Sequence, residues 1–345
     1  MAPTAGAGTA KMLSKLEASV KAGNFYEAQQ LYKSVSARYL SRGGARAEDA
    51  VELLQSGACV QLQQRQVTCG TELALLLVDA LSSTHAPHSQ ATVDRLLAIN
   101  DAFKPLLSHQ PASPPAAAAN AAAAAAAGVE SASESREQSA AASEAAASSE
   151  VSSAFDGCLS FLKAAIRWSL RSEGAPRHGA PELHDALAVL LWTHGATQDL
   201  EVASRHFVLG RDTKAFCSVL CQVMEQAFPD EVDLVLARAV LQYLAVGNMR
   251  GANGLMDDIT GGGAQSSAPP LPDSPLMHFL RFLLLTLERD ALPLFLLLRK
   301  VYAPSIRRDP QFHSYLDEIA HRYYKVARPS GGGDFMGGLL QMLMG

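Results

Sequence analysis

Apolar residues in the N-terminal part of the chain recur at intervals of three and four, the spacing of one face of an α-helix. The first such face consists of Ala28, Leu31, Tyr32, Val35 and Tyr39, and Gly43 and Gly44 follow it. Two further stripes run from Ala47 to Ala58 and from Leu73 to Leu81. The pattern therefore predicts three consecutive amphipathic helices between about residues 23 and 81, with a break at the paired glycines.

Local signals refine this prediction at two places. Asn24 can cap the first helix, and Glu27, three residues later, can bond back to the backbone of the cap. Gly57 and Ala58 are small residues on the apolar stripe of the second helix. They predict that a neighbouring helix approaches closely there.

The rest of the chain continues in short helical patterns separated by turns of two to six residues. We expect helices over residues 11–22, 92–107, 155–171, 183–194, 199–209, 214–228, 231–246, 249–259, 279–287 and 292–302, and a last one from Asp309-Pro310 to about Lys325. The spacing Gly-Asn-x-x-x-Ala occurs twice, at residues 23–28 and 247–252. Short helices at this spacing indicate an all-α fold, an α-solenoid of stacked antiparallel helix hairpins that is tetratricopeptide-like but degenerate.

Composition divides the chain into five segments. Residues 109–150 are rich in Ala, Ser and Pro and contain almost no large apolar side chain, so we expect a disordered insertion or a solvated helix. It separates a first helical half, residues 11–108, from a second, residues 151–327. Residues 1–10 are expected to be disordered, residues 261–275 to form a loop, and residues 328–345 to be a Gly-rich tail with a short amphipathic end.

Charge and cysteine usage restrict the class of protein. A formal net charge of −5 does not suggest nucleic-acid binding, and five cysteines without paired spacing indicate reduced thiols in a cytosolic protein. The most apolar stretch, residues 279–298, is interrupted by Arg281, Glu288, Arg289 and Asp290. We therefore interpret it as two buried helices joined by a charged turn, and expect no stable membrane insertion.

The sequence offers little for catalysis or metal binding. Cys217, Cys221 and His206 are the best candidate zinc ligands, but they do not reach the four converging ligands of a structural site. Candidate catalytic histidines, His184 with His194 and His313 with His321, accompany no known catalytic or phosphate-binding motif. We expect no enzyme activity, no metal and no cofactor.

Aromatic and basic residues suggest interfaces instead. Adjacent residues of a helix point about 100° apart, so one member of each pair Phe25-Tyr26 and Tyr323-Tyr324 is expected to face outward or onto the edge of a neighbouring helix, while other tyrosines pack the core. Such exposed aromatics anchor many interfaces. Arg307 and Arg308 serve either a helix end or an acidic partner, and the row Lys163, Arg167 and Arg171 is most simply a solvated face.

An ordered series of motifs resembles a known family. The motifs are Gly-Asn-Phe-Tyr-Glu-Ala-Gln-Gln (23–30), Ala-Arg-Tyr-Leu (37–40), Ala-Val-Glu-Leu-Leu-Gln-Ser-Gly-Ala (50–58), Gly-Thr-Glu-Leu-Ala-Leu-Leu-Leu (70–77), Ser-Ile-Arg-Arg-Asp-Pro (305–310), Tyr-Leu-Asp (315–317) and Gly-Gly-Leu-Leu (337–340). Together they are similar to the guided-entry-of-tail-anchored-proteins factor four family, the cytosolic Golgi-to-ER-traffic adaptor. The resemblance covers most of the chain outside residues 109–150.

The resemblance implies a bridging adaptor for the targeting of tail-anchored proteins to the ER membrane. The N-terminal half would dock the ATPase of this pathway, with Phe25, Tyr26, Arg38, Arg42 and Glu72 on the docking surface. Glu72 would restrain ATP hydrolysis, although an acidic residue in the first turn of a helix also stabilises the helix dipole without any partner.

The C-terminal half would hold a ubiquitin-like adaptor protein, and a chaperone scaffold is a further partner that the resemblance admits. The residues that we assign to this adaptor site are Phe279, Phe282, Tyr302, Arg307 and Arg308.

Three alternatives remain open at this point. The chain could be a helical-repeat scaffold subunit of another cytosolic complex, such as a proteasome-lid-type assembly, although such subunits typically end in a strand-containing module. A helical enzyme would need a pocket of convergent polar groups. The amphipathic end of the tail could also touch a membrane.

Overall fold

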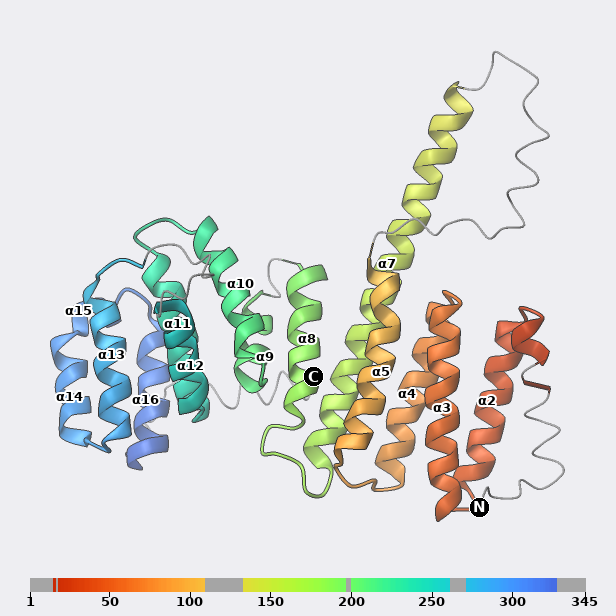
Figure 1. The fold of residues 1–345 in the computed structure, drawn as a ribbon, viewed down its shortest axis with the longest axis horizontal. Helices are drawn as coiled ribbons and strands as arrows, with labels where there is room; N and C mark the ends of the chain where they lie inside the picture. Colours follow the sequence, from red (N-terminus) through yellow and green to blue (C-terminus); the bar gives the residue numbers. More distant parts are fainter. Residues whose placement is uncertain (1–14, 17, 109–132, 197–199, 261–270, 328–345) are drawn as a thin grey trace. The chain divides into compact units, whose positions relative to one another are not determined.

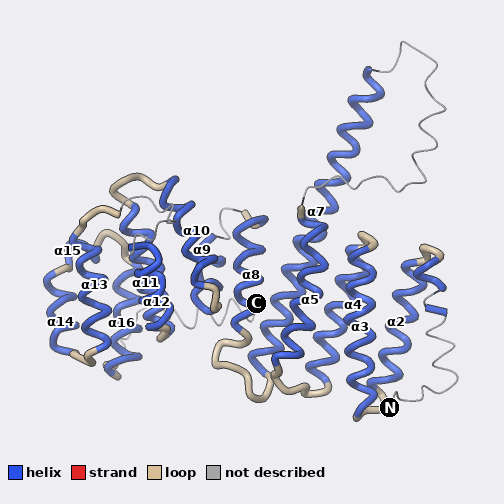
Figure 2. The backbone as a smooth tube through the Cα atoms, viewed as in Figure 1, coloured by secondary structure: helices blue, strands red, loops and turns tan. Residues whose placement is uncertain are grey.

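The structure is a computed structural model that describes residues 15–16, 18–108, 133–196, 200–260 and 271–327. Its regular secondary structure is helical throughout these residues (Figures 1 and 2). The chain forms two compact units, residues 1–175 and 176–345. Within each unit most helices pack on a neighbour in sequence or on the next but one, and the predicted all-α, α-solenoid fold class is confirmed.

Unit 1 is a stack of helices in which each helix also reaches its next neighbour but one. A helical segment ending at Lys21 precedes α2 (Phe25–Leu40), α3 (Ala45–Gln63), α4 (Val67–Ser83), α5 (Gln90–Leu107) and α7 (Ser133–Arg171). Helix α3 packs on α2, α4 and α5, and α7 packs on α4 and α5. The three N-terminal helices and the break after Leu40 are as the apolar pattern predicted.

A close approach between α2 and α3 fixes the first hairpin. Tyr32 of α2 is buried, and its ring lies over Gly57 of α3. A Cβ atom added at Gly57 would lie 2.8 Å from two ring atoms of Tyr32. The prediction that small residues allow a close helix contact here is therefore confirmed.

The two Gly-Asn-x-x-x-Ala segments build the same kind of helix junction. Gly23 and Gly247 have positive φ, and the amides of Asn24 and Asn248 bond back to the carbonyls of Ser19 and Tyr243. This is the pattern of a Schellman motif, in which a glycine ends one helix and the chain turns into the next.

The capping box predicted for α2 does not form. The Asn24 side chain makes no capping hydrogen bond, whereas the equivalent Asn248 accepts from the amide of Gly251 at 2.8 Å. Glu27 instead pairs with Lys15 of the preceding helical segment at 2.9 Å. A cation close in space therefore displaces the local backbone interaction.

The structure also changes the expected boundary between the halves. We predicted that order returns near Phe155 and that the second half begins at residue 151, but α7 already begins at Ser133 and belongs to unit 1. Arg65 binds Glu150 through two hydrogen bonds of 2.8 and 2.9 Å. Alanine and glutamate favour helix, and a helix anchored at one end propagates at low cost, so the Ala/Ser/Glu residues continue α7.

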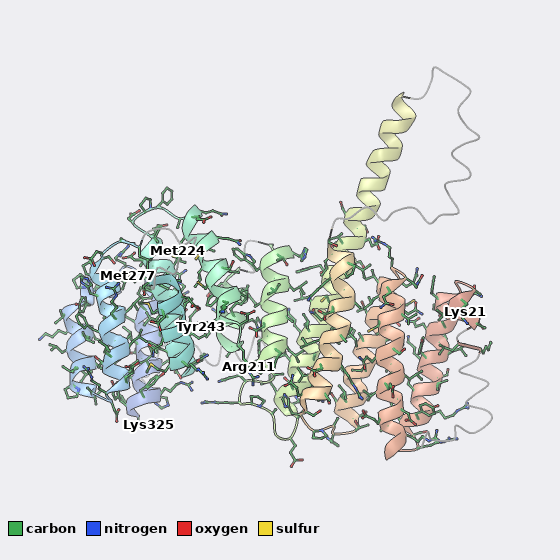
Figure 3. The ribbon with its side chains drawn as sticks, viewed as in Figure 1. Lys21, Arg211, Met224, Tyr243, Met277 and Lys325 are labelled. Atoms are coloured by element: carbon green, nitrogen blue, oxygen red, sulfur yellow. The ribbon has the colours of Figure 1, made fainter. Side chains whose placement is uncertain are left out.

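Unit 2 is organised around one buried helix. Its helices are α8 (Pro181–His194), α9 (Leu200–Leu209), α10 (Thr213–Gln226), α11 (Val232–Val246), α12 (Met249–Thr260), α13 (Pro275–Glu288), α14 (Leu292–Val301), α15 (Ala303–Ile306) and α16 (Gln311–Tyr324). Helix α11 packs against α9, α10, α12, α13 and α16. Tyr243, labelled in Figure 3, is fully buried and meets the ring of Phe216 edge-on at 5.9 Å.

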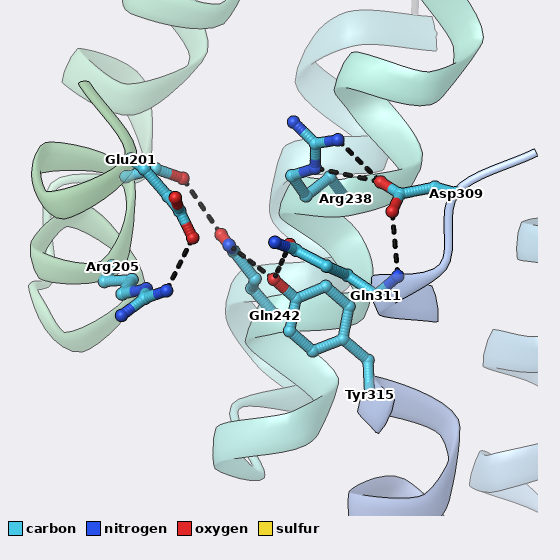
Figure 4. Close-up of polar contacts among 8 residues, drawn as sticks. Glu201, Arg205, Arg238, Gln242, Asp309, Gln311 and Tyr315 are labelled. Carbon is cyan, nitrogen blue, oxygen red and sulfur yellow. Dashed lines mark hydrogen bonds and ion pairs between the residues drawn. The ribbon is translucent and has the colours of Figure 1, made fainter. Parts of the chain in front are cut away.

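Three polar side chains of α11 bind the segment that leads into α16. Arg238 pairs with Asp309 at 2.6 Å, and Gln242 donates to the hydroxyl of Tyr315 at 3.1 Å (Figure 4). Asp233, whose side chain is 2% exposed, binds Arg308 at 2.7 Å. We call these contacts the α11–α16 polar seam.

Several predictions fall outside the described residues. These are the N-terminal segment 1–10, the part of the insertion before residue 133, residues 261–270 of the predicted loop, and the tail from residue 328.

The Tyr32–Gly57 contact predicts a test of the first hairpin. Gly57→Ala should lower the free energy of unfolding by about 1–3 kcal/mol, because the added methyl group overlaps the Tyr32 ring. Gly254→Ala on α12 is the matched control, since its Cβ would meet nothing within 4 Å. That substitution should stabilise the protein by about 0.5–1 kcal/mol through helix propensity alone. Urea unfolding measures both, and equal stabilisation by the two would contradict the close-contact interpretation.

Candidate functional site

Unit 1 presents a polar surface where α2 and α4 lie side by side. Glu72 of α4 accepts hydrogen bonds from Gln29 at 2.8 Å and from Lys33 at 2.5 Å, both on α2. The carboxylate remains accessible, because the Glu72 side chain is 48% exposed. Tyr26 precedes Lys33 by seven residues, which is about two helical turns, so both lie on the same face of α2. Tyr26 is 71% exposed. Tyr26, Lys33 and Glu72 form what we call the N-terminal surface.

The other residues predicted for ATPase docking lie apart from this surface. Phe25 is half-buried, and its carbonyl accepts from Gln61 at 3.0 Å. Arg38 follows Tyr26 by twelve residues, which corresponds to about 18 Å along a helix and about 120° around it. Arg42 lies beyond the end of α2. Both arginines are exposed, but the structure does not bring them onto the face of Tyr26 and Lys33.

Unit 2 exposes an apolar face on α14. Leu294, Leu297 and Val301 are 49%, 53% and 60% exposed, and their spacing places them on one side of the helix. Phe295 is the one buried residue of α14. Helix α13 adds Phe282 and Leu285, which are 50% and 44% exposed. We call these five residues the C-terminal apolar face.

The interpretation of residues 279–298 as two buried helices is therefore wrong for the second helix. Figure 1 shows α14 at the edge of unit 2, where it packs on α13 and α15. Phe295 meets the ring of Tyr324 at 5.3 Å, and Arg299 pairs with Asp317 at 2.8 Å. Helix α14 is thus packed on only part of its circumference, and Leu294, Leu296 and Leu297 are exposed.

The residues predicted for adaptor binding separate into two groups. Phe279 is fully buried and packs against the ring of Tyr302 at 5.6 Å, so it supports the face from beneath and cannot contact a partner. Tyr302 is half-buried, whereas Phe282 and Arg307 are exposed. Arg308 pairs with Asp233 of the α11–α16 polar seam. Of the two roles left open for Arg308, this contact favours a structural role over contact with an acidic partner.

Two features of these surfaces escaped sequence reasoning. Lys33 and Gln29 were not singled out, although they follow Tyr26 at helical spacing and flank Glu72 in space. The exposed face of α14 was missed because an apolar run was taken as a sign of burial. A helix with leucines on several sides is typical of a buried helix, so the sequence carried no signal for the exposed side of α14.

The histidine and cysteine candidates do not converge as ligands. No group of three His, Cys, Asp or Glu side chains comes together among the described residues. Burial raises the pKa of the Cys217 thiol to about 12, so it is not a ready thiolate ligand. None of the described helices is both long and apolar enough to cross a bilayer.

These observations define a class of protein: a helical-repeat protein that exposes a polar surface in unit 1 and an apolar face in unit 2. Comparison with known proteins then gives the family. The family model described as Golgi to ER traffic protein 4 matches residues 45–344. The chain belongs to the Golgi to ER traffic protein 4 family, an adaptor family, which supports a role in the GET pathway of tail-anchored protein targeting.

Individual relatives agree with this assignment. Protein GET4 of Arabidopsis thaliana is 40% identical over 331 residues, which is 96% of this chain and 95% of that protein. The Golgi to ER traffic protein 4 homolog of Homo sapiens is 27% identical and covers 98% of this chain and 88% of its own. A crystal structure of C. therm. Get4 matches the fold with a TM-score of 0.66 at 24% identity, over 97% of this chain and 95% of that chain.

A buried titratable cluster in unit 2 sets an expected pH dependence. His184 is fully buried, and its Nε2 lies 2.8 Å from the carbonyl of His178. A carbonyl only accepts, so Nε2 carries the proton and Nδ1 accepts from Nδ1–H of His206 at 2.7 Å. Burial lowers the pKa of His184 to about 4 and raises the pKa of its neighbour Asp185 to about 6.

The two shifts act in opposite directions on stability. Between pH 6.5 and about 4, His184 binds a proton in the unfolded chain but not in the folded chain. Falling pH in this range therefore destabilises the fold by up to about 1.4 kcal/mol per pH unit. Between about pH 6 and the ordinary carboxyl pKa of 3.8, Asp185 binds a proton in the folded chain but not in the unfolded chain. Falling pH in this range therefore stabilises the fold. In the native protein the two contributions oppose each other.

We therefore expect Asp185→Asn to steepen the loss of unfolding free energy between pH 6 and 4, because only the His184 contribution then remains. His184→Leu should have the reverse effect on the slope. His313→Asn, at an exposed position of α16, is the control and should leave the slope unchanged. Urea unfolding at several pH values measures the slopes, and identical slopes in all four proteins would contradict the assignment.

Proposed function

We propose that this protein is a non-enzymatic adaptor that acts in the cytosol during post-translational targeting of tail-anchored proteins to the ER membrane. It bridges the ATPase of this pathway and a ubiquitin-like adaptor protein, and a chaperone scaffold is the third component. Family membership supports the pathway, and the two surfaces support the bridging role.

The observation that carries the proposal is the C-terminal apolar face. Six large apolar side chains are exposed on α13 and α14, the five of this face and Leu296, in a protein whose described helices otherwise bury most such residues. Exposed apolar patches of this kind mark protein-binding sites. The ubiquitin-like adaptor occupies this face in the proposal, and Phe282 and Arg307 remain adaptor-binding residues. Phe279, Tyr302 and Arg308 support it from within unit 2.

The N-terminal surface has the opposite character and suits a charged partner. Glu72 is restrained by Lys33 and Gln29 but keeps an accessible carboxylate, and Tyr26 provides an exposed aromatic anchor nearby. In the proposal this surface docks the ATPase, with Glu72 facing it and restraining hydrolysis. Phe25, Arg38 and Arg42 belong to the periphery of the docking site.

Glu72→Lys should weaken binding to the targeting ATPase about tenfold at low salt, and by less at high salt, because a charge contact is reversed and salt screens it. Calorimetry at two salt concentrations measures the effect. Glu52→Lys makes the same charge change at an exposed position of α3 and is the control. Equal loss in both variants would indicate a general charge effect and contradict a specific role for Glu72.

Leu297→Asp should abolish measurable binding to the ubiquitin-like adaptor, because it places a charge in the centre of the apolar face. Its stability should change little, since Leu297 is exposed in the free protein. Val189→Asp, at an exposed apolar position of α8, is the matched control. Retained adaptor binding in Leu297→Asp, measured by calorimetry, would exclude this face as the binding site.

A further inference from the structure

The C-terminal apolar face lies close to the point where the described chain ends. Tyr324, the last residue of α16, packs on Phe295 of α14, and its hydroxyl bonds to the carbonyl of Thr286 of α13 at 3.4 Å. The chain then turns back at Lys325, and the carbonyl of Val326 lies 3.0 Å from Nδ1 of His321. The last residues that the structure describes, up to residue 327, therefore follow directly on a contact with the two helices that carry the face.

The sequence that follows is matched to this face in chemistry. Residues 335–344 read Phe-Met-Gly-Gly-Leu-Leu-Gln-Met-Leu-Met and contain no charged side chain. Phe335, Leu339 and Leu343 recur at intervals of four, as do the residues of one helix face. Methionine side chains are flexible and adapt to irregular apolar surfaces. This property suits the C-terminal apolar face, which is built from side chains of different shapes.

The length of the tether and the charges next to the face also allow residues 335–344 to reach it. The tether of residues 328–334 extends to at most about 25 Å, whereas a ten-residue helix such as α14 is about 15 Å long. Asp334 precedes the apolar segment, and exposed Arg281 and Lys300 adjoin the face residues Phe282 and Val301.

A short tether of this kind holds a segment at an effective concentration on the order of millimolar. Even a weak intrinsic affinity of this segment is then enough for it to occupy the C-terminal apolar face of its own chain.

We propose that residues 335–344 bind the C-terminal apolar face of their own chain when no partner occupies it, and that the ubiquitin-like adaptor displaces them. The tail contact itself stands independently of the proposed function, whereas the competition with the adaptor rests on it. The tail thus covers the apolar face in the free protein and reduces the apparent affinity of any partner that uses it.

Hydrogen exchange of the full chain tests the tail contact. Leu339→Asp combined with Leu343→Asp should accelerate exchange of the α14 amides about two- to tenfold, because the cover is lost. Gln341→Asp adds charge at a polar position between them and is the control. Unchanged α14 exchange in the double variant would overturn the proposal. Protection that disappears on dilution would also overturn it, because a second copy and not the tail would then cover the face.

Adaptor affinity separates this proposal from the proposed function. The double variant should bind the ubiquitin-like adaptor about two- to tenfold more tightly than the native chain, since no tail has to be displaced. If α14 exchange accelerates but adaptor affinity is unchanged, the tail contact stands and the adaptor binds elsewhere, which contradicts the proposed function and the competition. If exchange is unchanged while Leu297→Asp still abolishes adaptor binding, the proposed function stands and the tail contact is wrong.

Discussion

The burial of α11 is the constraint on which unit 2 depends. A helix packed on most of its circumference cannot leave polar side chains without partners, because an unpaired buried group costs several kcal/mol. Asp233 and Gln242 are buried on this helix and bind Arg308 and Tyr315, and the exposed Arg238 of the same helix pairs with the buried Asp309. The three partners lie within eight residues of the chain, so satisfying α11 fixes both the start and the direction of α16. Ser204 of α9 donates a further hydrogen bond to Gln242 at 2.9 Å, which ties a third helix to the same seam.

The position of α14 follows from that of α16. Phe295 and Arg299 bind Tyr324 and Asp317 of α16, and α13 covers another side, but nothing among the described helices covers the remaining side. Helices α11 and α14 are both rich in leucine and valine, yet one is enclosed and the other is half exposed. The difference lies in their neighbours, not in their composition. The exposed apolar face is therefore a consequence of where the stack of described helices ends.

The same reasoning explains what could be predicted from the sequence. Helix positions, the all-α class and the close contact at Gly57 follow from local periodicity and side-chain size, which are present in the sequence itself. The Glu27 half of the predicted capping box failed because Lys15, twelve residues away, offers Glu27 a partner in space. The start of α7 was missed because composition describes propensity but not the anchoring that Arg65 gives to Glu150. Of the candidate site residues, Tyr26, Glu72 and Phe282 lie on exposed surfaces, whereas Phe279 and Arg308 serve the core and the polar seam.

The two surfaces differ in the physics of binding, and this difference suits the proposed bridging role. Contacts between charged, solvent-exposed groups form quickly and are weakened by salt, so a partner held through Glu72 and Lys33 exchanges readily. Burial of leucines and phenylalanine is insensitive to charge screening and gives slower dissociation, so a partner on α13 and α14 stays bound through several such exchanges. Since the surfaces belong to different compact units, a substitution in one leaves the packing of the other intact. An adaptor built in this way can retain one component while it releases the other.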